Sequence, residues 1–397
     1  MRSRVQDWLW GVKEAPAAPG TAGEATSAEL PARAAAASLL NDAGALLAES
    51  AEQKMPLKHQ IDAEIEESTV TSHDGVELHC RVIRGNAGPG NNGKGKVMLL
   101  CSPLGFSNIY VFRPLIAHFK KEYTYVNWDY RSLFLSSDPK RLRKCSIRDH
   151  AEDALDVLKA FGFECADAIV GHSMGVSVAC EFTLLFPESV NSLILVNGGH
   201  GHVFSTAFQP FFRIPFVGNV SEFIVSTLLQ NNPKRTMEII KAVGQSKPVA
   251  TTLNLLGRVT GTTMMLDVHG ESFWNEWISM YFGGLSSDDK SAAAYCRLFQ
   301  ELNAHSTYHL LHLIEQPTLL VAGSLDYLTP PYLMKEMARE MPNAEYKSCF
   351  STHLTLMENP EFVVENAAKF LKEIEDGKRV QRCGSVAFRP AQITNEN

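Results

Sequence analysis

Along much of the chain, apolar residues recur at two spacings. One is typical of strands and the other of helices. Between residues 97 and 197, short apolar runs of strand length are separated by longer stretches in which apolar residues recur at helical spacing. Strands that alternate with helices in this way usually pair in parallel, and the helices cover the sheet. A later apolar run, Pro317 to Gly323, predicts another buried parallel strand. The pattern therefore predicts an α/β fold.

The residues before position 97 predict a pair of strands at the start of this sheet. The run Glu67 to Ser72 is followed by Asp74-Gly75, a dipeptide typical of hairpin turns. Residues Val76 to Val82 then alternate between apolar and polar side chains, as in a half-buried strand. The segment from Gly85 to Lys96 contains five glycines and is expected to form a loop.

The strand–helix alternation stops after residue 197 and resumes near residue 314. Helical patterns and many aromatic residues fill this interval, which predicts a helical insertion over residues 198–313 in a core formed by residues 61–197 and 314–375. Residues 1–60 are rich in Ala, Pro, Gly, Ser and Glu and are expected to form a flexible, partly helical tail. Residues 376–397 are expected to form a flexible C-terminal tail.

A candidate nucleophile lies between a predicted strand and a predicted helix. Residues 171–175 read Gly-His-Ser-Met-Gly, a Gly-x-Ser-x-Gly motif that follows an apolar run and precedes a helix-like stretch. A serine at such a sharp turn holds its Oγ away from the backbone, where a base can reach it. Strand and helix come close together at this turn, so the flanking positions must be small, as Gly171 and Gly175 are. The motif predicts Ser173 as a nucleophile.

A nucleophilic serine needs a histidine base and an acid that orients the histidine, and the C-terminal part of the chain offers both. Asp326 follows the strand predicted at 317–323, and His353 follows a strand predicted at 345–350. Ligands of open α/β sheets bind at the carboxyl ends of the strands. Asp326 taken alone also fits a turn former or a helix cap. Three such residues at strand ends, in this order, favour a triad of Ser173, Asp326 and His353.

These motifs together resemble the α/β-hydrolase superfamily, from about Val76 to Glu373. The segments that carry the resemblance are residues 97–107, 126–131, 149–161, 171–175, 192–197, 317–326 and 353–360. The resemblance implies a mostly parallel eight-stranded sheet flanked by helices, with residues 198–313 as a helical lid. It also implies the chain order nucleophile, acid, histidine, and an oxyanion hole made by the backbone N–H groups of Leu104 and Met174.

Two loops depart from the family's pattern. Ser102-Pro103 stands where His-Gly is common, so Leu104 is expected to be the oxyanion donor, although proline makes this loop stiff. In a register shifted by two residues, Phe106 becomes the donor; we prefer Leu104, because the loop then starts directly after the strand. Tyr130-Arg131 continues into residues 132–135, Ser-Leu-Phe-Leu, where the family often continues with Gly-His-Gly.

The expected function is that of a serine hydrolase that cleaves an ester, thioester or related acyl bond, without a cofactor and without a metal. The aromatic content of the lid indicates a small-molecule acyl substrate with an apolar portion. The residues expected to contact it are Phe106, His172, Phe212, Phe216 and Trp274. The run Phe204 to Phe216 leaves open a weak contact between the lid and a membrane surface.

Three other kinds of function occur on this fold. Epoxide hydrolases and haloalkane dehalogenases share the fold but attack with a carboxylate, which Ser173 does not provide. An acyltransferase would use the same triad and pass the acyl group to an alcohol or amine. A ligand-binding or scaffold member of the fold would typically lack a triad residue, and none is missing here. Acyl transfer and a non-catalytic role therefore remain open.

Charge and composition indicate which kinds of partner the protein is expected to bind. The chain has 397 residues, 45% of them hydrophobic, and a net charge of −7, so no nucleic-acid surface is expected. The basic cluster between Lys140 and Lys144 fits a solvated loop. No apolar stretch reaches 18 residues, so no membrane-spanning helix is expected.

Cysteine usage and the first residues suggest a location. None of the eight cysteines forms a CxxC pair, so neither a metal site nor a disulfide framework is expected. Buried free thiols favour a reducing compartment, and we expect a cytoplasmic protein. The N-terminus begins with basic residues but soon carries Glu14 and Glu24, which disfavours import into an organelle without ruling it out.

Overall fold

The structure, a computed structural model, describes residues 64–88, 93–105, 109–140, 145–202 and 289–379, and a few single residues between 227 and 242. The main described ranges belong to one compact unit, Leu57–Asn397. The predicted N-terminal tail at 1–60, most of the predicted lid and residues 380–397 lie outside the described residues.

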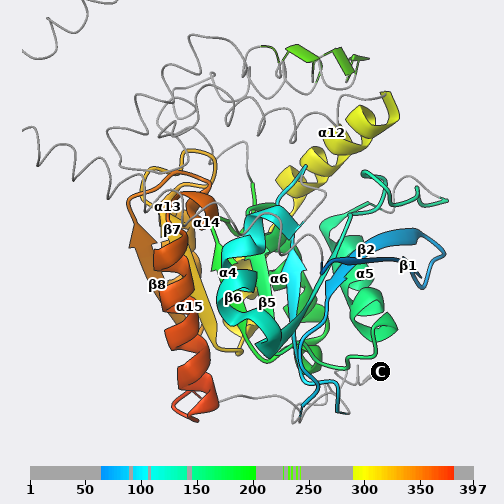
Figure 1. Cartoon of the computed structure of the whole chain (residues 1–397). Helices are drawn as coiled ribbons and strands as arrows, with labels where there is room; N and C mark the ends of the chain where they lie inside the picture. The colour runs from blue at the N-terminus through cyan, green and yellow to red at the C-terminus, as the bar shows by residue number, and fades with distance from the viewer. Residues whose placement is uncertain are drawn as a thin grey trace, which may run out of the picture. The chain divides into compact units, whose positions relative to one another are not determined.

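An eight-stranded sheet forms the centre of the described structure, in the order β1-β2-β4-β3-β5-β6-β7-β8 (Figure 1). The strands are β1 (Glu66–Thr71), β2 (Glu77–Ile83), β3 (Lys96–Cys101), β4 (Tyr123–Trp128), β5 (Ala168–His172), β6 (Leu193–Val196), β7 (Thr318–Gly323) and β8 (Ala344–Cys349). β2 pairs antiparallel with β1 and with β4, and every other pairing is parallel. The mostly parallel sheet and its N-terminal hairpin are as the sequence pattern predicts.

The central strands are buried along their whole length because helices cover both faces of the sheet. The α-helices are α4 (Arg113–Phe119), α5 (Ile147–Ala160), α6 (Met174–Leu185), α12 (Asp289–Ala304), α13 (Pro331–Glu340), α14 (Thr355–Glu358) and α15 (Pro360–Glu375). The short 3₁₀ helices are η2 (Ile109–Phe112), η3 (Lys120–Glu122), η4 (Pro187–Ser189) and η6 (Tyr308–Leu313). None of the helices in the described part of the chain is both long and apolar enough to cross a bilayer.

Two hydrophobic clusters correspond to the two faces of the sheet. One cluster takes in apolar residues of α5, α6, α12 and α13, among them Val157, Phe182 and Leu298. The other takes in α4 and α15 through residues such as Leu115 and Phe370. The sheet is therefore held rigidly between two helical layers, which fixes the loops at the carboxyl ends of its strands.

The two ends of the predicted insertion meet at the edge of the core. Gly201 and Ser306 form an isolated antiparallel bridge, and the Thr307 amide donates to the His200 carbonyl over 2.9 Å. The helix α12 lies inside the predicted insertion, and its Leu298 packs in the same hydrophobic cluster as α5 and α6. Residues 200–201 and 306–307 thus lie side by side, while α12 packs on the core although it falls inside the predicted insertion.

Candidate active site

Ser173 lies at a sharp turn between β5 and α6. Its backbone has φ 56° and ψ −117°, a conformation that residues with a side chain rarely adopt. The Ser173 amide donates to the Val196 carbonyl of β6 over 3.0 Å, which holds the turn against the sheet. Strain of this kind persists only where the surroundings determine it, and it is frequent at functional sites.

The two glycines of the motif let the strand, the helix and a neighbouring loop come together around Ser173. A Cβ on Gly171 would lie 2.6 Å from the Gly175 carbonyl oxygen. A Cβ on Gly175 would lie 2.0 Å from the Cys101 carbonyl oxygen and 3.0 Å from that of Ser102. Both distances to backbone atoms are shorter than any side chain tolerates, so glycine is required at both positions.

The fold brings Ser173, His353 and Asp326 into one line of hydrogen bonds. His353 Nε2 lies 2.8 Å from Ser173 Oγ, and His353 Nδ1 lies 2.8 Å from Asp326 Oδ2. The serine and the histidine are 180 residues apart in the chain, and the histidine and the acid 27. The loops that follow β5, β7 and β8 therefore meet at one edge of the sheet, as the sequence predicts for these three residues.

Asp326 is nearly inaccessible to solvent and is held by many donors. Its Oδ1 accepts from the amides of Leu328 and Thr329, each over 2.9 Å, and its Oδ2 accepts from the Thr329 hydroxyl and from Asn197 Nδ2. Burial alone raises the pKa of this carboxyl, but the positive charge and hydrogen bond of His353, together with the Thr329 donors, lower it below its ordinary value. The group is thus an anion fixed beside the imidazole.

His172 contacts the loop that carries His353. It is fully buried at the end of β5, and its Nε2 donates to the backbone carbonyl of His353 over 2.9 Å. Its ring lies 5.4 Å from the ring of His353, centroid to centroid. Burial and the charge of His353 lower the pKa of His172 to about 3, so this ring is neutral. These contacts do not test whether His172 also touches substrate, and that role stays a prediction.

The loop that carries His353 is anchored on its other side by Glu358. This carboxylate accepts from the amide of Thr352 over 2.6 Å and from its hydroxyl over 2.5 Å. The Thr352 carbonyl in turn accepts from Asn197 Nδ2 over 2.9 Å. Asn197 therefore bridges the acid and the histidine loop. The sequence signals for these supports were weak: Asn197 stands at a strand end, and Thr329 follows Asp326 closely.

The loop expected to form the oxyanion hole lies against the nucleophile turn. Leu104 is in the turn that follows β3, and the nearby carbonyls of Cys101 and Ser102 approach Gly175 closely. Met174 is the first residue of α6, so its amide has no acceptor inside the helix. The loop after β3 thus starts beside the first turn of α6, and the oxyanion role of Leu104 and Met174 stays a prediction.

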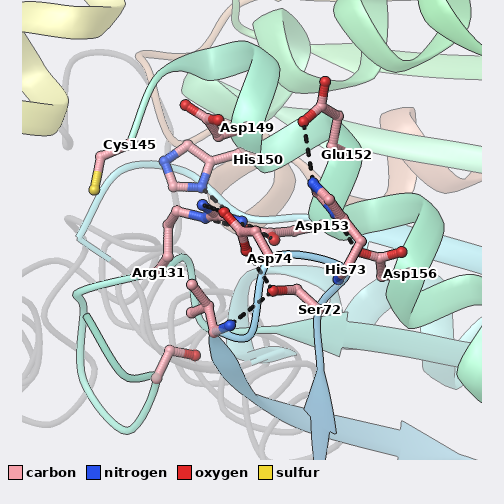
Figure 2. Close-up of polar contacts among 12 residues, drawn as sticks. Ser72, His73, Asp74, Arg131, Cys145, Asp149, His150, Glu152, Asp153 and Asp156 are labelled. Carbon is pink, nitrogen blue, oxygen red and sulfur yellow. Dashed lines mark hydrogen bonds and ion pairs between the residues drawn. The ribbon is translucent and has the colours of Figure 1, made fainter. Parts of the chain in front are cut away.

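The loop after β4 is fixed by buried ion pairs. Asp129 accepts from Arg81 over 2.8 Å, which leaves it paired with a cation. Arg131 has no exposed side-chain surface and binds Asp153 and Asp74, the latter over 2.9 Å (Figure 2). Each guanidinium nitrogen has an acidic partner, as buried charges require.

The remaining predicted substrate contacts lie outside the described residues: these are Phe106, Phe212, Phe216 and Trp274. Among the residues that the structure describes, no group of three or more His, Cys, Asp or Glu side chains is arranged to hold a metal ion.

Comparison with known proteins agrees with this fold. The family described as alpha/beta hydrolase fold matches residues 96–360, more than half of the chain. The chain therefore belongs to the α/β-hydrolase family. Among solved structures, it resembles a membrane phospholipase A described as a novel bacterial virulence factor, with a TM-score of 0.58 and 18% identity over 87% of this chain and 97% of the other. At that identity the likeness concerns the fold alone.

Two curated relatives match parts of the chain. Homoserine O-acetyltransferase of Chloroherpeton thalassium is 23% identical over 216 residues, which cover 52% of this chain and 56% of the relative. Epoxide hydrolase 4 of Mus musculus is 28% identical over 152 residues, which cover 34% of this chain and 41% of the relative. The chain spans about half the length of these relatives or less.

Proposed function

We propose that this protein is a serine hydrolase that cleaves an ester, thioester or related acyl bond of an apolar small molecule. The observation that carries the proposal is the line of two 2.8 Å contacts from Ser173 Oγ through His353 to Asp326. A serine, a base within hydrogen-bond reach and a buried acid on the far side of the base are the arrangement that acyl transfer to serine needs.

In the proposed reaction, Ser173 Oγ attacks the acyl carbonyl carbon while its proton moves to His353 Nε2. Asp326 holds the Nδ1–H tautomer and stabilises the imidazolium that forms. The amides of Leu104 and Met174 donate to the oxyanion, and loss of one such donor typically costs on the order of 10²–10³ in rate. The proton then passes to the leaving group, and a water molecule, deprotonated by the same histidine, releases the acid from Ser173.

The substrate choice is proposed to reside in the lid. The aromatic residues Phe212, Phe216 and Trp274 of the predicted insertion would line an apolar acyl pocket, together with Phe106 of the loop after β3. Replacing one of the lid aromatics with Ala is expected to change preference among acyl chain lengths more than the rate on an acetyl ester. Each methylene of contact should shift discrimination by about 1–3 kcal/mol. Rates on nitrophenyl esters of graded length measure this.

Acyl transfer is the second candidate function, because the first curated relative is named as an acetyltransferase. The triad would be the same, and an alcohol or amine would take the place of water in the second step. The other curated relative is named as an epoxide hydrolase, but the residue at the nucleophile turn here is Ser173 and not a carboxylate. A cytoplasmic location and a weak contact of the lid with a membrane surface stay predictions.

Labelling by a fluorophosphonate probe separates an enzyme from a ligand-binding member of the fold. We expect the purified wild-type protein to be labelled and to hydrolyse nitrophenyl esters, and Ser173→Ala to do neither. Ser177→Ala removes a buried hydroxyl one turn further along α6 and is the matched control, expected to behave as wild type. Labelling that persists in Ser173→Ala contradicts the proposal, and product analysis with added alcohols or amines distinguishes transfer from hydrolysis.

A further inference from the structure

Tyr130, the second residue after β4, makes a hydrogen bond to the loop that carries Leu104. Its side chain is buried, and its hydroxyl donates to the Ser102 carbonyl oxygen over 2.8 Å. Burial raises the pKa of this phenol well above its ordinary value, so the hydroxyl keeps its proton near neutral pH and remains a donor. The contact joins two loops at the carboxyl ends of β3 and β4.

The bonded carbonyl controls the direction of the Leu104 amide. The Ser102 carbonyl belongs to the planar peptide that links it to Pro103. The proline ring then holds the next torsion, φ of Pro103, near −65°. Only ψ of Pro103 remains free between the held carbonyl and the Leu104 N–H. A bond to the Ser102 carbonyl therefore limits how far that N–H can turn.

Both partners of this bond are themselves fixed. Asn127 Nδ2 donates to Ser102 Oγ over 2.9 Å, so a side chain of β4 holds the same residue as well. The Tyr130 ring packs edge-on against Trp128 at 5.7 Å and in a tilted arrangement against His150 at 4.8 Å, centroid to centroid. The residue after it, Arg131, is bound by Asp74 and Asp153, as Figure 2 shows. The Tyr130 hydroxyl is therefore held in one position, and it holds the Ser102 carbonyl in place.

We propose that Tyr130 is a positioning residue for the oxyanion hole, which holds the Ser102 carbonyl so that the Leu104 amide points at the developing oxyanion. The inference rests on the proposed function, since an oxyanion arises only when Ser173 attacks an acyl group. It also explains why a Ser-Pro sequence serves in place of the family's common His-Gly: the stiff proline carries the fixed direction from Ser102 to Leu104.

The test compares Tyr130→Phe with Tyr125→Phe in the full-length protein. Tyr125 is a buried tyrosine of β4 whose hydroxyl has no hydrogen-bond partner among the described residues, so its variant controls for loss of a buried hydroxyl. In Tyr130→Phe, kcat for a nitrophenyl ester is expected to fall about tenfold, less than the loss of a whole donor, because Leu104 keeps its amide. KM should stay within about twofold, because the ground-state ester makes little use of the oxyanion hole.

An alkylboronic acid, which forms a tetrahedral anion on the serine, reports on the same site. Its inhibition constant should rise by the factor by which kcat falls in Tyr130→Phe, and neither should change in Tyr125→Phe. Equal kcat values in the two variants overturn the inference. A fall in kcat without the matching loss of boronate affinity also overturns it, because the effect would then lie outside the anion-binding step.

A second variant, Pro103→Ala, keeps the inference testable if Tyr130→Phe does not fold. It frees φ of Pro103 and leaves the Tyr130 hydroxyl in place, so the same fall in kcat and boronate affinity is expected. Wild-type values in Pro103→Ala overturn the inference. Absence of Ser173-dependent turnover in the wild type is a different failure: it overturns the proposed function and, with it, the role of Tyr130.

Discussion

Asp326 combines two local roles that are usually separate. Its Oδ1 accepts from the amides of Leu328 and Thr329, as in a turn-forming aspartate, while its Oδ2 faces His353. In Asp326→Asn, the carboxamide can keep the turn but presents an N–H to the imidazole, which favours the wrong tautomer. We expect a folded protein whose turnover is reduced by up to about 10⁴, measured with a nitrophenyl ester and checked by thermal unfolding.

A rate near wild type in Asp326→Asn would show that Asp326 acts only in the turn. The acid would then have to come from elsewhere. Asp129 is a poor substitute, because Arg81 binds both of its oxygens. Asn197 carries an amide, and its Nδ2 already donates to Asp326.

Ser173 and His353 are expected to act as one unit. Ser173→Ala and His353→Ala should each remove nearly all activity while the melting temperature stays close to that of wild type, because the serine lies in a turn held by backbone contacts. The double variant should be scarcely slower than either single variant, since removing one partner already disables the other. Losses that add on a logarithmic scale would contradict a joint role.

The triad could be predicted from the sequence because each member has a local signature. Ser173 stands in a five-residue motif, and Asp326 and His353 each follow a strand pattern. The supporting groups have no such signature. Asn197 reaches Asp326 across 129 residues, and His172 reaches the His353 carbonyl across 181. Such bonds depend on how strands are ordered in the sheet, which a pattern of single residues does not encode.

The nucleophile turn depends on the contact between the helix α6 and the end of the strand β3. A methyl group on Gly175 would collide with the Cys101 carbonyl at 2.0 Å, and that backbone is held within the sheet. Gly175→Ala is therefore expected to cost about 1–3 kcal/mol of unfolding free energy, as overpacked sites do, and to displace the loop of Leu104. Denaturant unfolding measures the first effect, and ester turnover the second.

Gly88→Ala is the matched control for this prediction. A Cβ there would find its nearest neighbour, the Gly95 Cα, at 3.8 Å, an ordinary contact. Its stability and turnover should equal those of wild type. If Gly175→Ala also leaves stability and turnover unchanged, the close packing of α6 on β3 is not what holds the turn.

Element boundaries lie within a few residues of those expected from the sequence, and the start of α5 shows where the difference comes from. The strand predicted at 317–323 is β7 (Thr318–Gly323), and the segment 149–161, which carries part of the family resemblance, lies almost wholly in α5 (Ile147–Ala160). α5 begins two residues before that segment, because Ser146 and Asp149 form a capping box at its N-terminus. Caps are set by hydrogen bonds to the backbone, so hydrophobic periodicity alone misplaces the first turn.

At the scale of the whole molecule, two buried histidines link folding to pH. His150 and His172 have no exposed surface, and a Nδ1 of each has no hydrogen-bond partner among the described residues. Burial lowers the pKa of His150 to about 3, helped by the charge of Arg131 and opposed by Asp149. Burial and the charge of His353 lower the pKa of His172 to about 3. Unfolded histidine titrates near 6.5.

The sign of the pH effect follows from these values. Between about pH 3 and 6.5 the unfolded chain binds protons at both positions and the folded protein does not, so stability falls as the pH falls. Each histidine contributes up to about 1.4 kcal/mol per pH unit in this window. Above about pH 6.5 both states carry neutral rings, and this contribution is flat.

His150→Phe isolates one of the two contributions. The phenyl ring keeps an aromatic contact with Tyr130 and removes the group that must lose its proton on folding. Between pH 8 and pH 5, the variant should lose about 2 kcal/mol less unfolding free energy than wild type, since each pH unit below 6.5 is worth about 1.4 kcal/mol. Urea unfolding at the two pH values measures the difference, and the comparison at pH 8 alone gives the packing effect of the larger ring. Equal losses in the two proteins would mean that His150 is already protonated in the folded state, with Asp153, 3.9 Å away, as its counter-ion.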